Sequence, residues 1–131
     1  MTLAPGHAVK RHPGLANLRI LIVEDQAMVC MALEDMLLEL GCVIVGPALG
    51  LRKAVELATT ETLDGAVLDI NLGDDRSFPV AAILRDRGIP FLFATGYGDR
   101  GLERPFDDAL VLAKPYNLAS LERSLSDILS C

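Results

Sequence analysis

The sequence predicts an open α/β fold in which parallel strands alternate with helices around one core. Strand-like and helix-like segments alternate about five times along the chain, an order typical of this class. The strand-like segments are apolar throughout, as expected when helices cover both faces of a sheet. The 131 residues fit one domain, and 51% of them are hydrophobic, which is too many for a disordered chain.

Five segments with continuous apolar stretches, rich in branched side chains, are predicted to be strands. Most of them end at an acidic, hydroxyl or basic side chain, and Gly46-Pro47 ends the second strand. In chain order they are LRILIVED (18–25), CVIVGPA (42–48), GAVLDI (65–70), IPFLFATG (89–96) and ALVLAKP (109–115).

Four segments between and after these strands are predicted to be helices. The first has apolar residues every three or four positions and stops at Gly41, Gly88 closes the third, and Asn117 is a suitable cap for the last. They are AMVCMALEDMLLELG (27–41), LRKAVELATTE (51–61), FPVAAILRDRG (78–88) and NLASLERSLSDILS (117–130).

Two segments do not fit the alternation of strands and helices. Residues 97–108, YGDRGLERPFDD, stand where a further helix is expected but contain Gly98, Gly101 and Pro105, so we expect an irregular fourth helix there. Residues 1–17 hold two prolines and two glycines without periodicity, and we predict a flexible N-terminal tail followed by one domain over 18–131.

Composition excludes several classes of protein. The net charge of −6 is a poor match for nucleic acid or an anionic membrane surface. The first residues lack the apolar core of a signal peptide, and no stretch could span a membrane, so we expect a cytoplasmic protein. Three cysteines without CxxC spacing favour buried thiols at Cys30 and Cys42 and an exposed Cys131, not a zinc site.

The ends of the predicted strands carry side chains that can bind ligands or take part in catalysis. Glu24-Asp25, Asp69, Thr95 and Lys114 end the first, third, fourth and fifth strands. In an open α/β sheet, ligands bind at the carboxyl ends of the strands. Three acids brought together there favour a divalent cation such as Mg²⁺, and with a hydroxyl and an ammonium they form a site for phosphoryl transfer. Asp69 would be the nucleophile.

Each residue also has a plain structural interpretation. Asp69 could cap a turn, Glu24-Asp25 could cap the following helix, Thr95 could belong to an ordinary loop, and Lys114 could be a solvated side chain. Because four separate strand ends all carry what the chemistry needs, the joint functional interpretation is favoured over coincidence.

These residues resemble the receiver domains of bacterial two-component response regulators. LIVED, AVLDINL, FATG and LAKPY occur in the family's order at the strand ends, and the resemblance covers residues 18 to 130 or so. It implies a flavodoxin-like (CheY-like), doubly wound, five-stranded parallel sheet of order 2-1-3-4-5. It also implies that Asp69 accepts a phosphoryl group from a sensor histidine kinase.

The resemblance assigns further roles. Asp25 and Asp69 would bind Mg²⁺ directly, Glu24 through water, and Asn71 through its backbone carbonyl. Thr95 and Lys114 would contact the phosphoryl group and catalyse its transfer and hydrolysis. Such a domain is a signalling phosphoprotein that promotes its own phosphorylation and autodephosphorylation rather than a classified enzyme.

The stretch FATGYG (93–98) resembles the FAT-GUY subfamily of receivers. That resemblance implies a single-domain receiver and a kinase of the HWE or a related class. At Gly96 the missing side chain either leaves the phosphoryl group open to water or serves a tight turn after the strand.

Three departures from the family concern signalling. Val111 stands three residues before Lys114, where receivers typically have an aromatic switch, and Tyr97 is a candidate substitute within a switch region formed by Thr95, Gly96, Tyr97 and Val111. The irregular segment 97–109 is expected to become ordered on phosphorylation. The loop DINLGDD (69–75) lacks the common proline and has a flexible, negative rim.

We therefore predict a stand-alone receiver that relays or drains phosphoryl groups in a phosphorelay, or binds a partner when phosphorylated, without contacting DNA or a membrane. Its partners would be the kinase and a histidine phosphotransfer protein or a downstream protein. The alternative is a receiver-like interaction module that acts independently of phosphorylation. A metal-dependent phosphohydrolase is disfavoured because Asn71 stands where such enzymes need a second acid.

Overall fold

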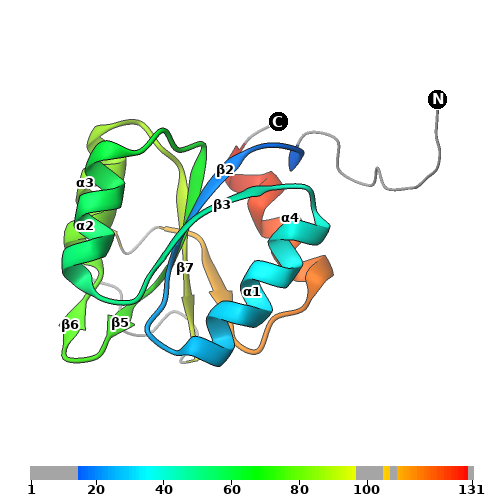
Figure 1. Cartoon of the computed structure of the whole chain (residues 1–131), viewed down its shortest axis with the longest axis horizontal. Helices are drawn as coiled ribbons and strands as arrows, with labels where there is room; N and C mark the ends of the chain where they lie inside the picture. The colour runs from blue at the N-terminus through cyan, green and yellow to red at the C-terminus, as the bar shows by residue number, and fades with distance from the viewer. Residues whose placement is uncertain (1–14, 97–104, 107–108, 130–131) are drawn as a thin grey trace.

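A five-stranded parallel sheet with helices on both faces forms the body of the molecule (Figure 1). The computed structural model describes residues 15–96, 105–106 and 109–129. The strand order β3-β2-β4-β7-β8 is the predicted order 2-1-3-4-5. The strands are β2 (Arg19–Val23), β3 (Val43–Ala48), β4 (Gly65–Asp69), β7 (Phe91–Thr95) and β8 (Val111–Ala113).

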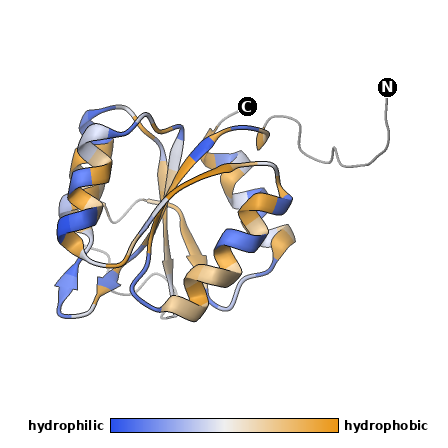
Figure 2. Cartoon of the chain, in the orientation of Figure 1, coloured by the Kyte–Doolittle hydropathy of each residue, from blue (hydrophilic) through white to orange (hydrophobic). Residues whose placement is uncertain are grey.

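Two helices cover each face of the sheet. On one face α2 and α3 pack over a core that contains Leu21, Leu68 and Phe93, and on the other face α1 and α4 enclose Ile22, Val67 and Leu92. Figure 2 shows the apolar strands between the mixed surfaces of the helices. The helices are α1 (Ala27–Glu39), α2 (Leu51–Thr60), α3 (Phe78–Asp86) and α4 (Leu118–Leu129). None of these helices has the length and apolar character needed to cross a membrane.

The local signals of the sequence correspond to backbone features. Gly41 and Gly88 follow α1 and α3 with φ of 89° and 72°, the left-handed conformation that favours glycine after a helix. The side chain of Asn117 accepts a hydrogen bond from the Ser120 N–H (2.8 Å), which confirms the predicted cap of α4. Strand β3 runs through Gly46-Pro47 to Ala48 with a shift in register against β2, so this pair does not end the strand.

The packed part of the chain begins earlier than the predicted boundary at residue 18. Leu15 is 2% exposed and belongs to the core on the α1 and α4 side of the sheet. The Asn17 N–H donates a hydrogen bond to the Gly41 carbonyl (2.7 Å), which holds this segment against the end of α1. Burial of one large apolar side chain and this bond place residues 15–17 within the domain rather than in the tail.

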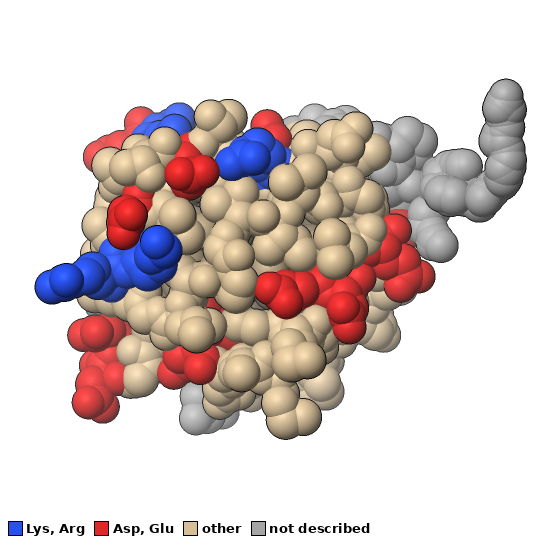
Figure 3. Space-filling model, in the orientation of Figure 1, with Lys and Arg blue, Asp and Glu red and all other residues tan. Residues whose placement is uncertain are grey.

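A small antiparallel hairpin that the sequence did not predict follows β4. It consists of β5 (Asn71–Leu72) and β6 (Asp75–Arg76), with Leu72 paired to Asp75. Leu72 is buried, whereas Asp74 and Asp75 are exposed. Figure 3 shows acidic side chains at the end of the molecule where the hairpin lies, in agreement with the negative rim predicted for this loop.

The predicted irregular helix over 97–108 lies outside the described residues except for Pro105 and Phe106. Phe106 is 4% exposed, so it is a core residue. The side chains of the chain's four phenylalanines form one cluster with ring centroids 5.5 to 6.3 Å apart. The Arg85 guanidinium lies 4.7 Å from the centre of the Phe106 ring and donates a hydrogen bond to the Pro105 carbonyl (2.9 Å).

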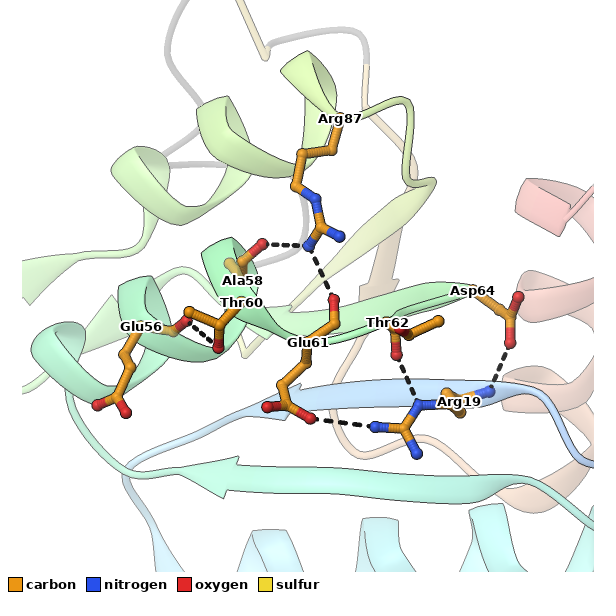
Figure 4. A network of polar contacts seen from close by, with 8 residues as sticks. All are labelled: Arg19, Glu56, Ala58, Thr60, Glu61, Thr62, Asp64 and Arg87. Atoms are coloured by element: carbon orange, nitrogen blue, oxygen red, sulfur yellow. Dashed lines mark hydrogen bonds and ion pairs between the residues drawn. The ribbon is translucent and has the colours of Figure 1, made fainter.

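At the amino end of β2, two arginines join α2, α3 and β2 (Figure 4). Arg87, after α3, donates hydrogen bonds to the carbonyls of Ala58 (2.6 Å) and Glu61 (2.9 Å) at the end of α2. Arg19 donates to the Thr62 carbonyl (2.6 Å) and pairs with the Glu61 carboxylate (3.1 Å). These bonds satisfy carbonyls that have no partner within the helix.

Replacement of Phe106 by alanine is expected to lower the free energy of unfolding by about 3–5 kcal/mol, because it empties a packed aromatic site. Urea denaturation followed by circular dichroism would measure this loss. Leu110→Ala is the matched control, since Leu110 is 37% exposed and its loss should cost less than about 1 kcal/mol. Equal losses for the two variants would contradict the core position of Phe106.

Candidate functional site

The predicted site residues meet at the carboxyl ends of the parallel strands, at the lower edge of the sheet in Figure 1. Glu24 and Asp25 follow β2, Asp69 and Thr95 are the last residues of β4 and β7, and Lys114 follows β8. A cavity of about 390 Å³ lies at this edge. Its lining includes six of the predicted site residues, namely Asp25, Asp69, Asn71, Thr95, Gly96 and Lys114.

Three carboxylates form the acidic part of the site. The side chains of Glu24, Asp25 and Asp69 each offer an oxygen atom within 4.8 Å of the others. Glu24 and Asp69 are 2% and 9% exposed, whereas Asp25 is more open to solvent. Such oxygen donors are the ligands that Mg²⁺ prefers, so the donor set fits a hard divalent cation.

Lys114 supplies the positive charge. Its Nζ lies 2.9 Å from Oε1 of Glu24 and 3.4 Å from Oδ1 of Asp69, so one ammonium serves two carboxylates. The second oxygen of Glu24 accepts a hydrogen bond from the Gln26 N–H (3.1 Å). Three carboxylates and one ammonium leave two negative charges in excess, which is the charge of one divalent cation.

Burial and charge act on the protonation of this group. Burial, and then the neighbouring charge of Glu24, raises the pKa of Asp69 from its ordinary value of 3.8 to about 7. Burial lowers the pKa of Lys114, but the hydrogen bond to Glu24 and the charge of Asp69 outweigh burial and raise the pKa above its ordinary value. Lys114 therefore stays charged, whereas burial among the crowded acids favours the protonated form of Asp69.

Thr95 and Gly96 form the wall of the cavity at the end of β7. Thr95 is 1% exposed, and its carbonyl accepts a hydrogen bond from the Lys114 N–H (2.9 Å), which ties the ends of β7 and β8 together. A side chain added at Gly96 would meet no atom within 4 Å. The space beside Gly96 is therefore open, as one of the two interpretations of this glycine requires.

The remaining predicted residues are placed less centrally. Asn71 is exposed on β5 and lines the cavity, and the role of its carbonyl stays a prediction. Val111 is half-buried on β8, pairs in register with Phe93, and packs against the α2 and α3 core. Tyr97 lies outside the described residues, so the switch predicted there stays a prediction.

Two residues that line the cavity, Gln26 and Gly73, were not predicted to have a role. The Gly73 N–H, in the β5–β6 loop, donates a hydrogen bond to Oδ2 of Asp25 (2.8 Å). The hydrogen bond itself has no local signal in the sequence, but the turn that places this amide has one, because Gly-Asp between two short strand-like segments is a hairpin sequence. Gly73 has the positive φ, 63°, that such a loop requires.

No protein-family model matches the chain. Among curated proteins, the phyllosphere-induced regulator PhyR of Methylorubrum extorquens is 35% identical over 115 residues, which are 84% of this chain and 43% of that protein. The chain thus spans about half the length, or less, of the curated relatives it matches.

Solved structures agree with this relationship. SdrG from Sphingomonas melonis is 38% identical with a TM-score of 0.77, over 86% of this chain and 97% of that chain. The response regulator receiver domain of PhyR from Erythrobacter litoralis is 27% identical with a TM-score of 0.77, over 89% of this chain and 93% of that chain.

A more distant structure shares the fold. The receiver domain of the sensor histidine kinase PA1611 from Pseudomonas aeruginosa is 23% identical with a TM-score of 0.72, over 88% of this chain and 100% of that chain. That domain has a magnesium ion coordinated in its active-site cleft.

The raised pKa of Asp69 predicts that the metal-free protein loses stability as pH rises. The carboxyl binds its proton more tightly in the folded state (pKa about 7) than in the unfolded state (near 3.8). The folded state therefore holds more protons between about pH 4 and 7, and the free energy of unfolding falls across this window. Asp69→Asn, which is neutral at all pH values, should exceed wild type by about 2–3 kcal/mol more at pH 8 than at pH 5.

Urea denaturation at pH 5, 6, 7 and 8 with EDTA would measure this difference. Asp74→Asn is the control, because it removes an exposed carboxylate of the hairpin loop that does not belong to the acid cluster. A constant difference between Asp69→Asn and wild type at all four pH values would contradict a raised pKa.

Proposed function

The chain belongs to the receiver domains of response regulators, and from that premise we propose that Asp69 accepts a phosphoryl group from a phosphohistidine of a sensor histidine kinase. The observation that carries this proposal is the position of the Asp69 carboxylate. It ends a buried strand, faces a cavity of about 390 Å³, and lies 3.4 Å from the Lys114 ammonium.

In the proposed transfer, an oxygen of Asp69 forms a bond to phosphorus as the bond between phosphorus and the donor imidazole breaks. The imidazole leaves with a proton taken from solvent, and Asp69 becomes an aspartyl phosphate. The ionised form of Asp69 is the nucleophile, so the reaction needs the carboxyl to be deprotonated. Lys114 is close enough to neutralise negative charge on the phosphoryl oxygens during the transfer. The Thr95 hydroxyl is the proposed hydrogen-bond donor at the end of β7.

Mg²⁺ is the proposed cofactor, held by Asp25 and Asp69, with Glu24 acting through water and the Asn71 carbonyl completing the set. When bound, the ion neutralises charge on the acids and on the transferring group. Two excess negative charges and three carboxylate oxygens within 4.8 Å support this assignment. The ion would also favour ionised Asp69, since its charge lowers the cost of a third carboxylate.

Downstream, the phosphorylated domain would pass its phosphoryl group to a histidine phosphotransfer protein or bind a protein partner. The kinase would be of the HWE or a related class, as the FATG motif at residues 93–96 suggests by its resemblance to the FAT-GUY subfamily. Neither DNA nor a membrane is a proposed partner of this domain, because its net charge of −6 opposes binding to anionic surfaces.

Incubation with acetyl phosphate and Mg²⁺ is expected to add one phosphoryl group to the wild-type chain and none to Asp69→Asn, as measured by intact mass. Lys114→Met, which removes the ammonium, should reduce the rate of this addition by about 100-fold, the scale expected for loss of one charge-stabilising group. Asp64→Asn is a control, because that carboxylate contacts Arg19 at the opposite end of the sheet. Equal phosphorylation of wild type and Asp69→Asn would contradict the proposal.

Gly96→Val is expected to lengthen the life of the aspartyl phosphate. A side chain there has open space and would stand beside the phosphoryl group, where it hinders the approach of water. The half-life would be followed by mass after removal of the phosphodonor. Gly50→Val is the matched control, since Gly50 has equally open space and an extended backbone but does not line the cavity. An unchanged or shorter half-life would show that Gly96 does not control access.

A further inference from the structure

One hydrogen bond joins the acid cluster to the hairpin that follows β4. The Gly73 N–H donates to Oδ2 of Asp25 over 2.8 Å, although the two residues are 48 positions apart in the chain. Both residues line the same cavity. Of the three acids, Asp25 is the one most open to solvent, so its side chain is the least restrained by packing.

The hairpin geometry leaves this amide free for Asp25. Leu72 and Asp75 pair across a two-residue loop in which Gly73 comes first, with φ of 63°. In a two-residue hairpin the ladder bonds are made by the flanking residues, so the N–H of the first loop residue points away from the ladder. The loop is also anchored, because Leu72 is buried and the Ser77 N–H donates to the Ile70 carbonyl (2.9 Å).

We propose that Gly73 is a positioning residue for the cation: its backbone N–H holds the Asp25 carboxylate in the orientation that binds Mg²⁺. This inference rests on the proposed Mg²⁺ site. A carboxylate has two oxygens, and a hydrogen bond to one of them fixes the plane of the group while the other remains available to a cation. The rotational freedom of Asp25 is then lost on folding and not on binding.

The same contact makes the hairpin responsive to the cation. Partners that orient a metal ligand commonly change metal affinity by 10- to 100-fold when they are removed. Because coupling between two equilibria is reciprocal, a cation that prefers the oriented Asp25 also stabilises the Gly73 loop. Binding at the acid cluster is thereby communicated to the exposed rim formed by Asp74 and Asp75.

The test compares two versions of the full chain that differ in one N–H. Gly73→D-Ala and Gly73→D-Pro both favour a positive φ at this loop position, but only D-Ala keeps the backbone N–H. The chains can be assembled by native chemical ligation at Cys42, with a wild-type chain made the same way. Isothermal titration calorimetry would give the dissociation constant for Mg²⁺ in each.

We expect D-Ala to bind Mg²⁺ within about twofold of wild type and D-Pro to bind about tenfold more weakly. In metal-free protein, nuclear magnetic resonance should show slower hydrogen exchange of the Gly73 amide in wild type than in Asp25→Ala. Addition of Mg²⁺ should slow it further in wild type only. Circular dichroism would establish that each chain is folded.

Two results would overturn the inference, and both differ from failure of the receiver function. If D-Pro and D-Ala bind Mg²⁺ equally, the N–H does not position Asp25. If the Gly73 amide exchanges equally fast in wild type and Asp25→Ala, the bond is not formed in solution. If the wild-type chain itself binds no Mg²⁺, the proposed cofactor is wrong, whatever the two D-residue chains do.

Discussion

The contact of the Lys114 ammonium with Glu24 and Asp69 is the interaction on which the site depends. It joins the ends of three strands, two of which, β2 and β8, are not neighbours in the sheet. Without it, Glu24 would be a carboxylate at 2% exposure whose remaining hydrogen bond among the described residues comes from the Gln26 amide, which is a costly state. The lysine that follows β8, the last strand of the sheet, lies at the same edge and compensates the acids at the ends of the apolar strands.

The pairing of charges in the site is incomplete, and the excess negative charge is relevant to the proposed chemistry. One ammonium cannot neutralise three carboxylates, and burial, followed by the charge of Glu24, raises the pKa of Asp69 to about 7. The metal-free fold is thus less stable near neutral pH than a chain with a neutral residue at that position. In the proposed function, a divalent cation would remove this deficit, and Lys114 would contact the phosphoryl group on Asp69. The local cost to stability and the proposed phosphoryl transfer would then have the same origin, the crowded acids of the site.

The strand order and the convergence of Glu24, Asp25, Asp69, Thr95 and Lys114 could be predicted because each depends on long, strongly patterned segments. The β5–β6 hairpin was missed since strands of two residues are too short to show a period, and only Gly73-Asp74 marks the turn. Leu15 was assigned to the tail because its neighbours are turn-forming residues, and local composition does not reveal that one side chain is buried. Hydrogen bonds between distant backbone and side-chain atoms, such as Gly73 to Asp25, have no local sequence signal.

Strand β8 has no aromatic ring at Val111, but aromatic rings on the neighbouring elements form a cluster beside it. Val111 pairs with Phe93, two residues before Thr95, and packs against the cluster that also holds Phe106. Arg85 covers the Phe106 ring and binds the Pro105 carbonyl, so the chain just before β8 is held to α3 by a cation and a buried ring. The start of α3 contributes Phe78 to the same cluster and is reached from Asp69 through the hairpin. Phe93, two residues before Thr95 on β7, and Phe78, at the start of α3, therefore both pack against the Phe106 ring.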